Sequence, residues 1–95
     1  MTNKDAYIQK LHAKIDEWSA EIDKLNARAE KAEADSRIEY QKQVENLQAK
    51  RKELEERMEK VRASGEDAWE DLKAGLERAW GSMETAIESA RSRFK

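Results

Sequence analysis

The sequence predicts an all-α protein, in which a long coiled-coil helix and a shorter amphipathic helix form a hairpin that assembles into an oligomeric bundle. Charged residues make up 42% of the chain and proline is absent, a composition typical of long helices. No glycine occurs between residues 4 and 63, and the apolar residues there recur at the spacing of a coiled coil. Since 95 residues are enough for one small domain, we expect a single helical domain over residues 1–95.

An apolar stripe runs along the expected long helix, about residues 4–63. Its first part follows a heptad with spacings of three and four, from Ile8 to Leu25. The stripe thins over Ala27–Ser36, which we expect to remain helical because alanine is the strongest helix former. It then resumes at Tyr40, and Val44 and Leu47 lie one residue out of step with the first heptads. The expected oligomer seam consists of Ile8, Leu11, Ile15, Trp18, Ile22, Leu25, Tyr40, Val44, Leu47, Leu54, Met58 and Val61.

An eleven-residue repeat is visible from residue 47 to the end of the chain: LQAKRKELEER, MEKVRASGEDA, WEDLKAGLERA, WGSMETAIESA and RSRFK. Eleven residues in about three turns keep an apolar stripe nearly straight along a helix. In the expected amphipathic helix, about residues 66–94, this stripe forms a face for a partner or for lipid. The partner face consists of Trp69, Leu72, Leu76, Trp80, Met83, Ile87 and Phe94.

A soft break is expected at residues 63–66, around Gly65. Glycine costs about 1 kcal/mol within a helix, and Ser64 followed by Asp67 has the form of a capping box. A turn here would fold the shorter helix back on the longer one. The alternative is one continuous helix of roughly 135 Å, because the stripe keeps its phase across Gly65.

Either arrangement predicts a partner. A single extended helix would bury almost none of its apolar stripe, and a hairpin would leave much of the seam from Ile8 to Leu25 uncovered. An exposed apolar seam favours association, so we expect a homo-oligomer, either a dimer or a four-helix assembly. A second helical protein or a membrane surface could instead occupy the partner face. Nucleic acid is not expected as a partner, since acidic and basic residues nearly balance and the net charge is only −2.

We expect no enzymatic activity, no cofactor site and no metal site. The chain has no cysteine, and its one histidine, His12, is spaced for an i,i+4 pair with Asp16 on a solvated helix face. No secretory signal or membrane-spanning run is apparent in the sequence, so a cytoplasmic location is expected.

The chain resembles small bacterial coiled-coil proteins that are catalogued as a stress-response family. The resemblance is carried by the segments YIQKLHAKIDEW, RIEYQKQVENL and SGEDAWEDLKAGLERAW, with SRF near the end. It implies a stress-associated role in the cytosol and supplies no catalytic or binding residues. The eleven-residue repeats are also similar in period to those of apolipoproteins and of hydrophilic desiccation-protection proteins.

Overall fold

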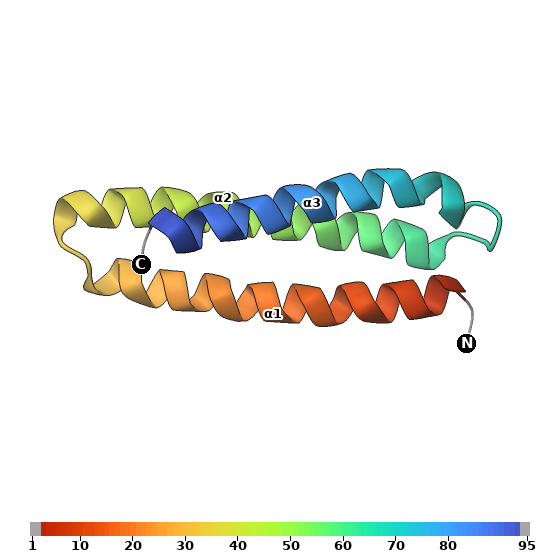
Figure 1. Ribbon diagram of the computed structural model, residues 1–95, viewed down its shortest axis with the longest axis horizontal. Coiled ribbons are helices and arrows are strands. Elements are labelled where there is room, and N and C mark those ends of the chain that lie inside the picture. The colour runs from red at the N-terminus through yellow and green to blue at the C-terminus, as the bar shows by residue number, and fades with distance from the viewer. Residues whose placement is uncertain (1–2, 94–95) are drawn as a thin grey trace.

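The computed structural model describes residues 3–93, which form three helices: α1 (Asn3–Lys31), α2 (Ala34–Ala63) and α3 (Trp69–Arg93). They lie side by side in an elongated bundle of 51 × 20 × 19 Å, in which α2 runs antiparallel to α1 and to α3 (Figure 1). The prediction of an all-α fold is therefore confirmed. The alternative of one continuous helix is wrong, because the chain reverses direction twice.

The first reversal lies inside the segment for which one long helix, about residues 4–63, was predicted. The predicted helix is interrupted between Lys31, where α1 ends, and Ala34, where α2 begins, so the prediction of one long helix is wrong there. Glu33 between them has extended backbone angles, and the Arg37 side chain donates to the Ala32 carbonyl at 3.1 Å. The turn brings the stripe of α2 onto the stripe of α1. Packing of apolar faces contributes more to helix stability than local propensity, so it overrides the helical preference of the alanine-rich segment.

The second reversal confirms the expected break around Gly65. The helix α2 ends at Ala63, and the Ser64 hydroxyl donates to the Val61 carbonyl at 2.6 Å. The next helix begins at Trp69, three residues later than expected. Lys4 Nζ donates to the Ser64 carbonyl at 2.7 Å, so the start of α1 is tied to the end of α2. A cation at this position also complements the negative end of the α2 dipole.

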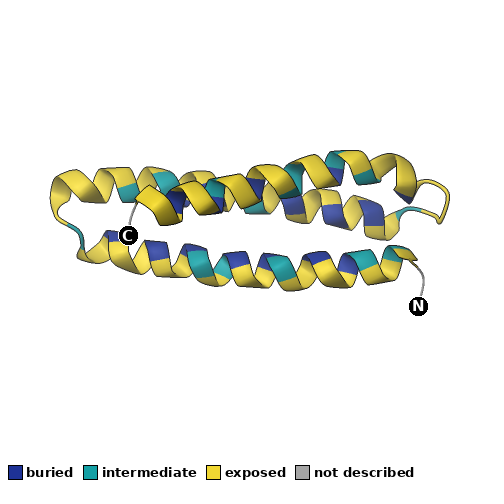
Figure 2. Cartoon of the chain, in the orientation of Figure 1, coloured by how far each residue is buried: buried dark blue, intermediate teal, exposed yellow. Residues whose placement is uncertain are grey.

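Apolar side chains from the three helices meet in one core along the length of the bundle (Figure 2). In α1 and α2 the buried residues follow the expected seam. The buried residues of α3 follow heptad spacing from Trp69 through Leu76 and Met83 to Ala90, rather than the eleven-residue repeat. Leu72, which that repeat placed on the apolar face, is 39% exposed. Helices that pack nearly antiparallel along their whole length favour the shorter coiled-coil period, which explains the difference.

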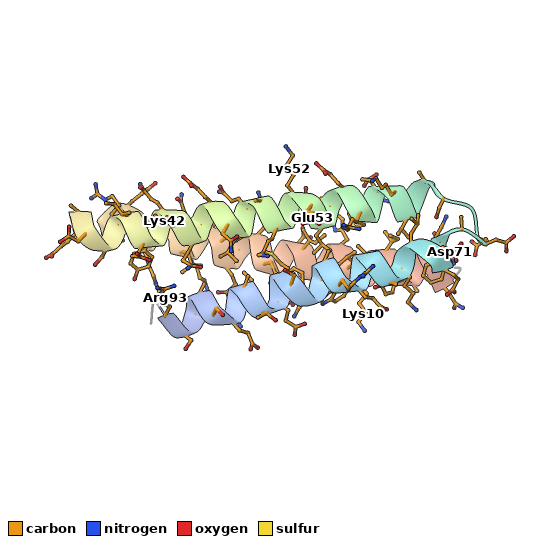
Figure 3. The ribbon with its side chains drawn as sticks, turned by 90° about the horizontal axis from the view of Figure 1, so that it is seen from above. Lys10, Lys42, Lys52, Glu53, Asp71 and Arg93 are labelled. Carbon is orange, nitrogen blue, oxygen red and sulfur yellow. The ribbon has the colours of Figure 1, made fainter. Side chains whose placement is uncertain are left out.

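Charged side chains cover the outside of the bundle, and no charged or polar residue among those described is buried. Figure 3 shows side chains such as Lys52 pointing away from the helices. The expected pair of His12 with Asp16 is present, with 3.5 Å between Nδ1 and Oδ2. Exposed pairs of this kind contribute little to stability, so the core holds the fold together.

Candidate functional site

The predicted oligomer seam lies inside a single copy of the chain. Tyr40 is half-buried, and the remaining seam residues are buried: Ile8, Leu11, Ile15, Trp18, Ile22, Leu25, Val44, Leu47, Leu54, Met58 and Val61. The need for burial, from which self-association was predicted, is therefore met by the chain's own three helices. Self-association itself stays a prediction, and any surface for it has to be sought elsewhere on the bundle.

Most of the predicted partner face also points into the core. Four of its residues are buried: Trp69, Leu76, Met83 and Ile87. Trp80 is half-buried and Leu72 is exposed, while Phe94 lies outside the described residues. Of the residues whose environment is described, Trp80 is thus the large aromatic side chain of this face that retains contact with solvent.

Aromatic rings of α1 and α3 gather at one end of the bundle. The Tyr7 ring lies 5.9 Å from the Trp69 ring and 6.2 Å from the Trp80 ring, measured between centroids. The Lys73 ammonium lies 5.4 Å from the centroids of both Tyr7 and Trp69. Sequence reasoning did not include Tyr7, although its position four residues before Leu11 places it on the same side of α1. These rings occupy the space between α1 and α3.

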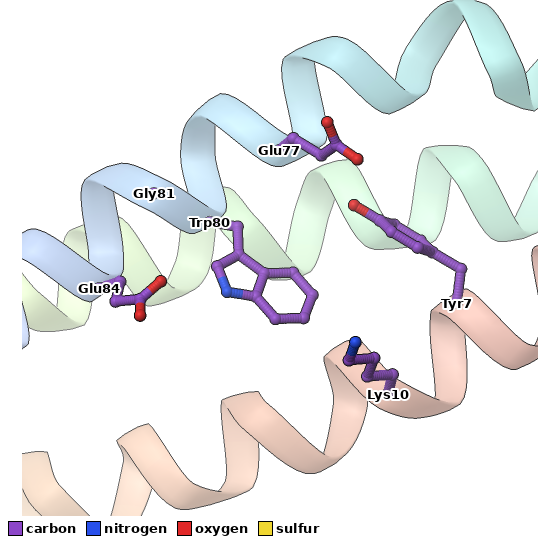
Figure 4. Close-up of a pocket in the computed structure, with 6 residues that line it drawn as sticks. All are labelled: Tyr7, Lys10, Glu77, Trp80, Gly81 and Glu84. Atoms are coloured by element: carbon purple, nitrogen blue, oxygen red, sulfur yellow. The ribbon is translucent and has the colours of Figure 1, made fainter.

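A hollow of about 360 Å³ opens beside this aromatic cluster, between α1 and α3 (Figure 4). Its lining consists of Tyr7, Lys10, Glu77, Trp80, Gly81 and Glu84. The Trp80 ring extends from α3 toward α1, and Lys10 extends toward it from the opposite wall. A methyl group added at Gly81 would meet no atom within 4 Å, so the space in front of this glycine is open. We call this hollow the Trp80 groove.

The Tyr7 hydroxyl sits at one end of the Trp80 groove, on the side of Glu77 (Figure 4). Its oxygen is buried, and the Glu77 carboxylate lies nearby but outside good hydrogen-bonding geometry. Burial, together with the nearby Glu77 carboxylate, raises the pKa of Tyr7 to about 12. An anion loses hydration when buried and is repelled by a neighbouring carboxylate, and only the protonated hydroxyl can donate toward Glu77, so all three causes disfavour the phenolate.

A second hollow, of about 350 Å³, lies further along the same side of the bundle. Here the Glu21 carboxylate of α1 pairs with the Arg91 guanidinium of α3 at 3.1 Å. The hydrogen bond from Arg91 lowers the pKa of Glu21 below its ordinary value. The helices α1 and α3 approach each other closely over a much shorter stretch than either does with α2. The α1–α3 side is therefore the open side of the bundle.

The Trp80 groove offers apolar ring surface flanked by charges, an arrangement suited to binding. Within residues 3–93, no group of three or more histidine, aspartate or glutamate side chains is placed to hold a metal ion. None of the helices described is both long enough and apolar enough to cross a bilayer. The chain has no significant match to a protein-family model, to a curated protein or to a solved structure.

Proposed function

We propose that this protein is a non-enzymatic helical interaction protein that takes up a partner helix, including one from another copy of itself, on its α1–α3 side. The observation that supports this most directly is the Trp80 groove, where the half-buried Trp80 lies beside Gly81, which faces open space. Partially covered tryptophan side chains are frequent energetic anchors of protein interfaces.

The shape of the open side fits a helix as the bound element. A three-helix bundle with one loosely closed side becomes a four-helix bundle when another helix is added there. Gly81 would let the backbone of that helix approach closely, while Trp80 and Tyr7 would supply apolar contact. Helix-in-groove recognition works in this way, through a few apolar anchors spaced along one helix face.

Filling the groove tests the proposal. Gly81→Leu places a leucine in open space, and it replaces a weak helix former, so the fold should hold. Ser89→Leu is the matched control, because Ser89 is exposed on α3, lies about two turns beyond Gly81 and does not line the groove. In sedimentation equilibrium we expect self-association of the native chain and of Ser89→Leu, and a monomeric Gly81→Leu. Association of Gly81→Leu as strong as that of the native chain would contradict a role for the groove.

Lipid binding through α3 is a second candidate, supported by the two tryptophans that this helix carries and by its short contact with α1. The apolar face of α3 is buried, so α3 would have to leave the bundle to reach a membrane. Flotation with anionic vesicles, with tryptophan emission as a second readout, tests this. Neither co-flotation nor a blue shift is expected if the bundle stays closed.

The cytoplasmic location and the stress-associated role stay predictions from the sequence. Both are compatible with an interaction protein, and neither contributes to the argument for the Trp80 groove. Following a fluorescently tagged copy in cells before and after heat or osmotic stress would test both.

A further inference from the structure

We propose that the partner at the Trp80 groove is a second copy of this chain, with Lys10 of each copy facing Glu84 and Glu77 of the other across a two-fold axis parallel to the helices. This inference rests on the proposed function and specifies its partner and its orientation. It follows from how charges are divided between the two walls of the groove.

The groove has one basic wall and one acidic wall. Lys10 lines it from α1, whereas Glu77 and Glu84 line it from α3 (Figure 4). A surface with opposite charges on its two sides is complementary to itself when the second copy is turned so that basic wall meets acidic wall. Two-fold dimers use the same patch on both subunits and require such self-complementarity.

The direction of the axis follows from the topology. The helices α1 and α3 run in the same direction along the bundle (Figure 1). A two-fold axis parallel to them packs α1 of each copy, as the added helix, against α3 of the other, so that α1 and α3 of the two copies form the four-helix arrangement. Each residue keeps its level along the bundle axis. Lys10 then meets the acidic wall of the partner. An axis lying across the helices would instead set α1 against α1 and bring lysine near lysine.

The charges needed for this contact are accessible. Lys10 and Glu84 are both exposed, and within residues 3–93 neither has an ion-pair partner. Glu77 is shared with Lys73 at 4.0 Å, which leaves Glu84 as the main acceptor. The net charge of −2 sets only weak overall repulsion against the approach of a second copy.

Apolar contact would accompany the charge contact. The methylene stem of Lys10 can lie over the half-buried Trp80 ring of the partner while its ammonium reaches the carboxylates. Tryptophan rings of this bundle already accept ammonium groups within one chain, since Lys14 lies 5.7 Å from the centroid of Trp18 and Lys73 lies 5.4 Å from that of Trp69. Contacts between an ammonium group and an aromatic ring strengthen when water is excluded, and the docking of two grooves would exclude water.

A charge swap between two variants tests the inference. Lys10→Glu and Glu84→Lys change exposed residues, so both variants should fold, as circular dichroism would verify. Each variant alone places like charges opposite each other at two symmetric contacts. We therefore expect self-association about tenfold or more weaker than that of the native chain. A mixture of the two variants restores opposite charges at both contacts and should associate as strongly as the native chain.

Disulfide trapping measures the orientation. The chain has no cysteine, so single substitutions carry no background. Lys10→Cys and Glu84→Cys chains, mixed under mild oxidation, should form a mixed disulfide faster than either chain pairs with itself. Preferred pairing of Lys10→Cys with itself would overturn the proposed axis.

The outcomes separate this inference from the function on which it rests. A native chain that remains monomeric up to millimolar concentration would overturn self-association and this inference together. A native chain that dimerises through a Gly81→Leu-sensitive surface, with no preference for the mixed charge pair, would overturn the inference alone. Selective association of the mixed pair supports both.

Discussion

The Trp80 ring meets the Trp18 ring edge to face, with 6.0 Å between centroids and 85° between ring planes. This contact joins α3 to α1 through two large side chains. Since long side chains rather than backbones span the space between these helices, room is left beside them in front of Gly81. The Trp80 ring therefore packs against the core through Trp18 and also lines the Trp80 groove.

Removing either ring should destabilise the bundle, to different degrees. Trp18 is 3% exposed, so Trp18→Ala should lower the free energy of unfolding by about 3–5 kcal/mol. Trp80→Ala should cost about half as much, because its ring is only partly covered. Edge-to-face pairs carry about 0.5–1.5 kcal/mol beyond their buried area. Urea denaturation of both single variants and the double variant should show this coupling, and strict additivity would contradict it.

The turn between α1 and α2 offers a site for stabilisation. Glu33 occupies the N-cap position of α2, and its side chain makes no capping hydrogen bond. Serine at this position accepts a bond from a free backbone N–H of the first turn, so Glu33→Ser should raise the free energy of unfolding by about 0.5–2 kcal/mol. Glu33→Ala provides the control, since it removes the same charge without supplying a cap. Equal thermal midpoints of the two variants would refute this assignment of the cap.

The sequence already contained a signal for this turn. The apolar stripe shifts by one residue between Leu25 and Val44, and such a shift was compatible with a locally relaxed supercoil. A helix end accounts for the same shift, because α1 and α2 each keep their own heptad register. Without glycine or proline in the segment, local propensity favoured a continuous helix. The gain from burying the two stripes against each other comes from the tertiary structure, which a local pattern does not contain.

The core residues of α1 and α2 and the turn at Gly65 were predictable, whereas the groove was not. Residues such as Ile15 and Leu47 lie in the core, as their spacing indicated. In α3 two periods fit almost the same residues, and the exposure of Leu72 and the burial of Ala90 distinguish them. Tyr7 and Lys10 become important because α3 passes beside them, a relationship that depends on two reversals of the chain. Sequence spacing predicts which face of a helix is apolar, but not which helix will cover it.

Two glycines of α3 should respond differently to alanine. Gly81 faces open space, so Gly81→Ala should stabilise the bundle by about 1 kcal/mol through helix propensity alone. At Gly75 an added Cβ would lie 3.0 Å from Nη1 of Arg57, so that side chain must move and the gain should be smaller. Chemical denaturation of both variants measures the difference. A Gly75→Ala variant more stable than Gly81→Ala would contradict this account of the two sites.

The Tyr7 hydroxyl gives the bundle a defined sensitivity to high pH. The unfolded chain releases this proton near pH 10, whereas the folded chain holds it until about pH 12. Unfolding therefore releases a proton between these values, so the contribution of Tyr7 is complete below pH 10 and is lost as the pH rises toward 12. Tyr7→Phe has no such proton and should lose less stability over this interval.

The same variant should be at least as stable as the native chain at neutral pH. The hydroxyl oxygen is buried with only the poorly aligned Glu77 carboxylate nearby, and leaving such a group unsatisfied costs up to about 1–3 kcal/mol. Urea denaturation of both proteins at neutral pH and at about pH 9 and 11.5 measures both effects. All other ionisable groups are the same in both proteins, so the difference between the two curves isolates Tyr7. Parallel curves of unfolding free energy against pH would show that the folded and unfolded states bind the Tyr7 proton equally. That result would contradict the burial of this hydroxyl.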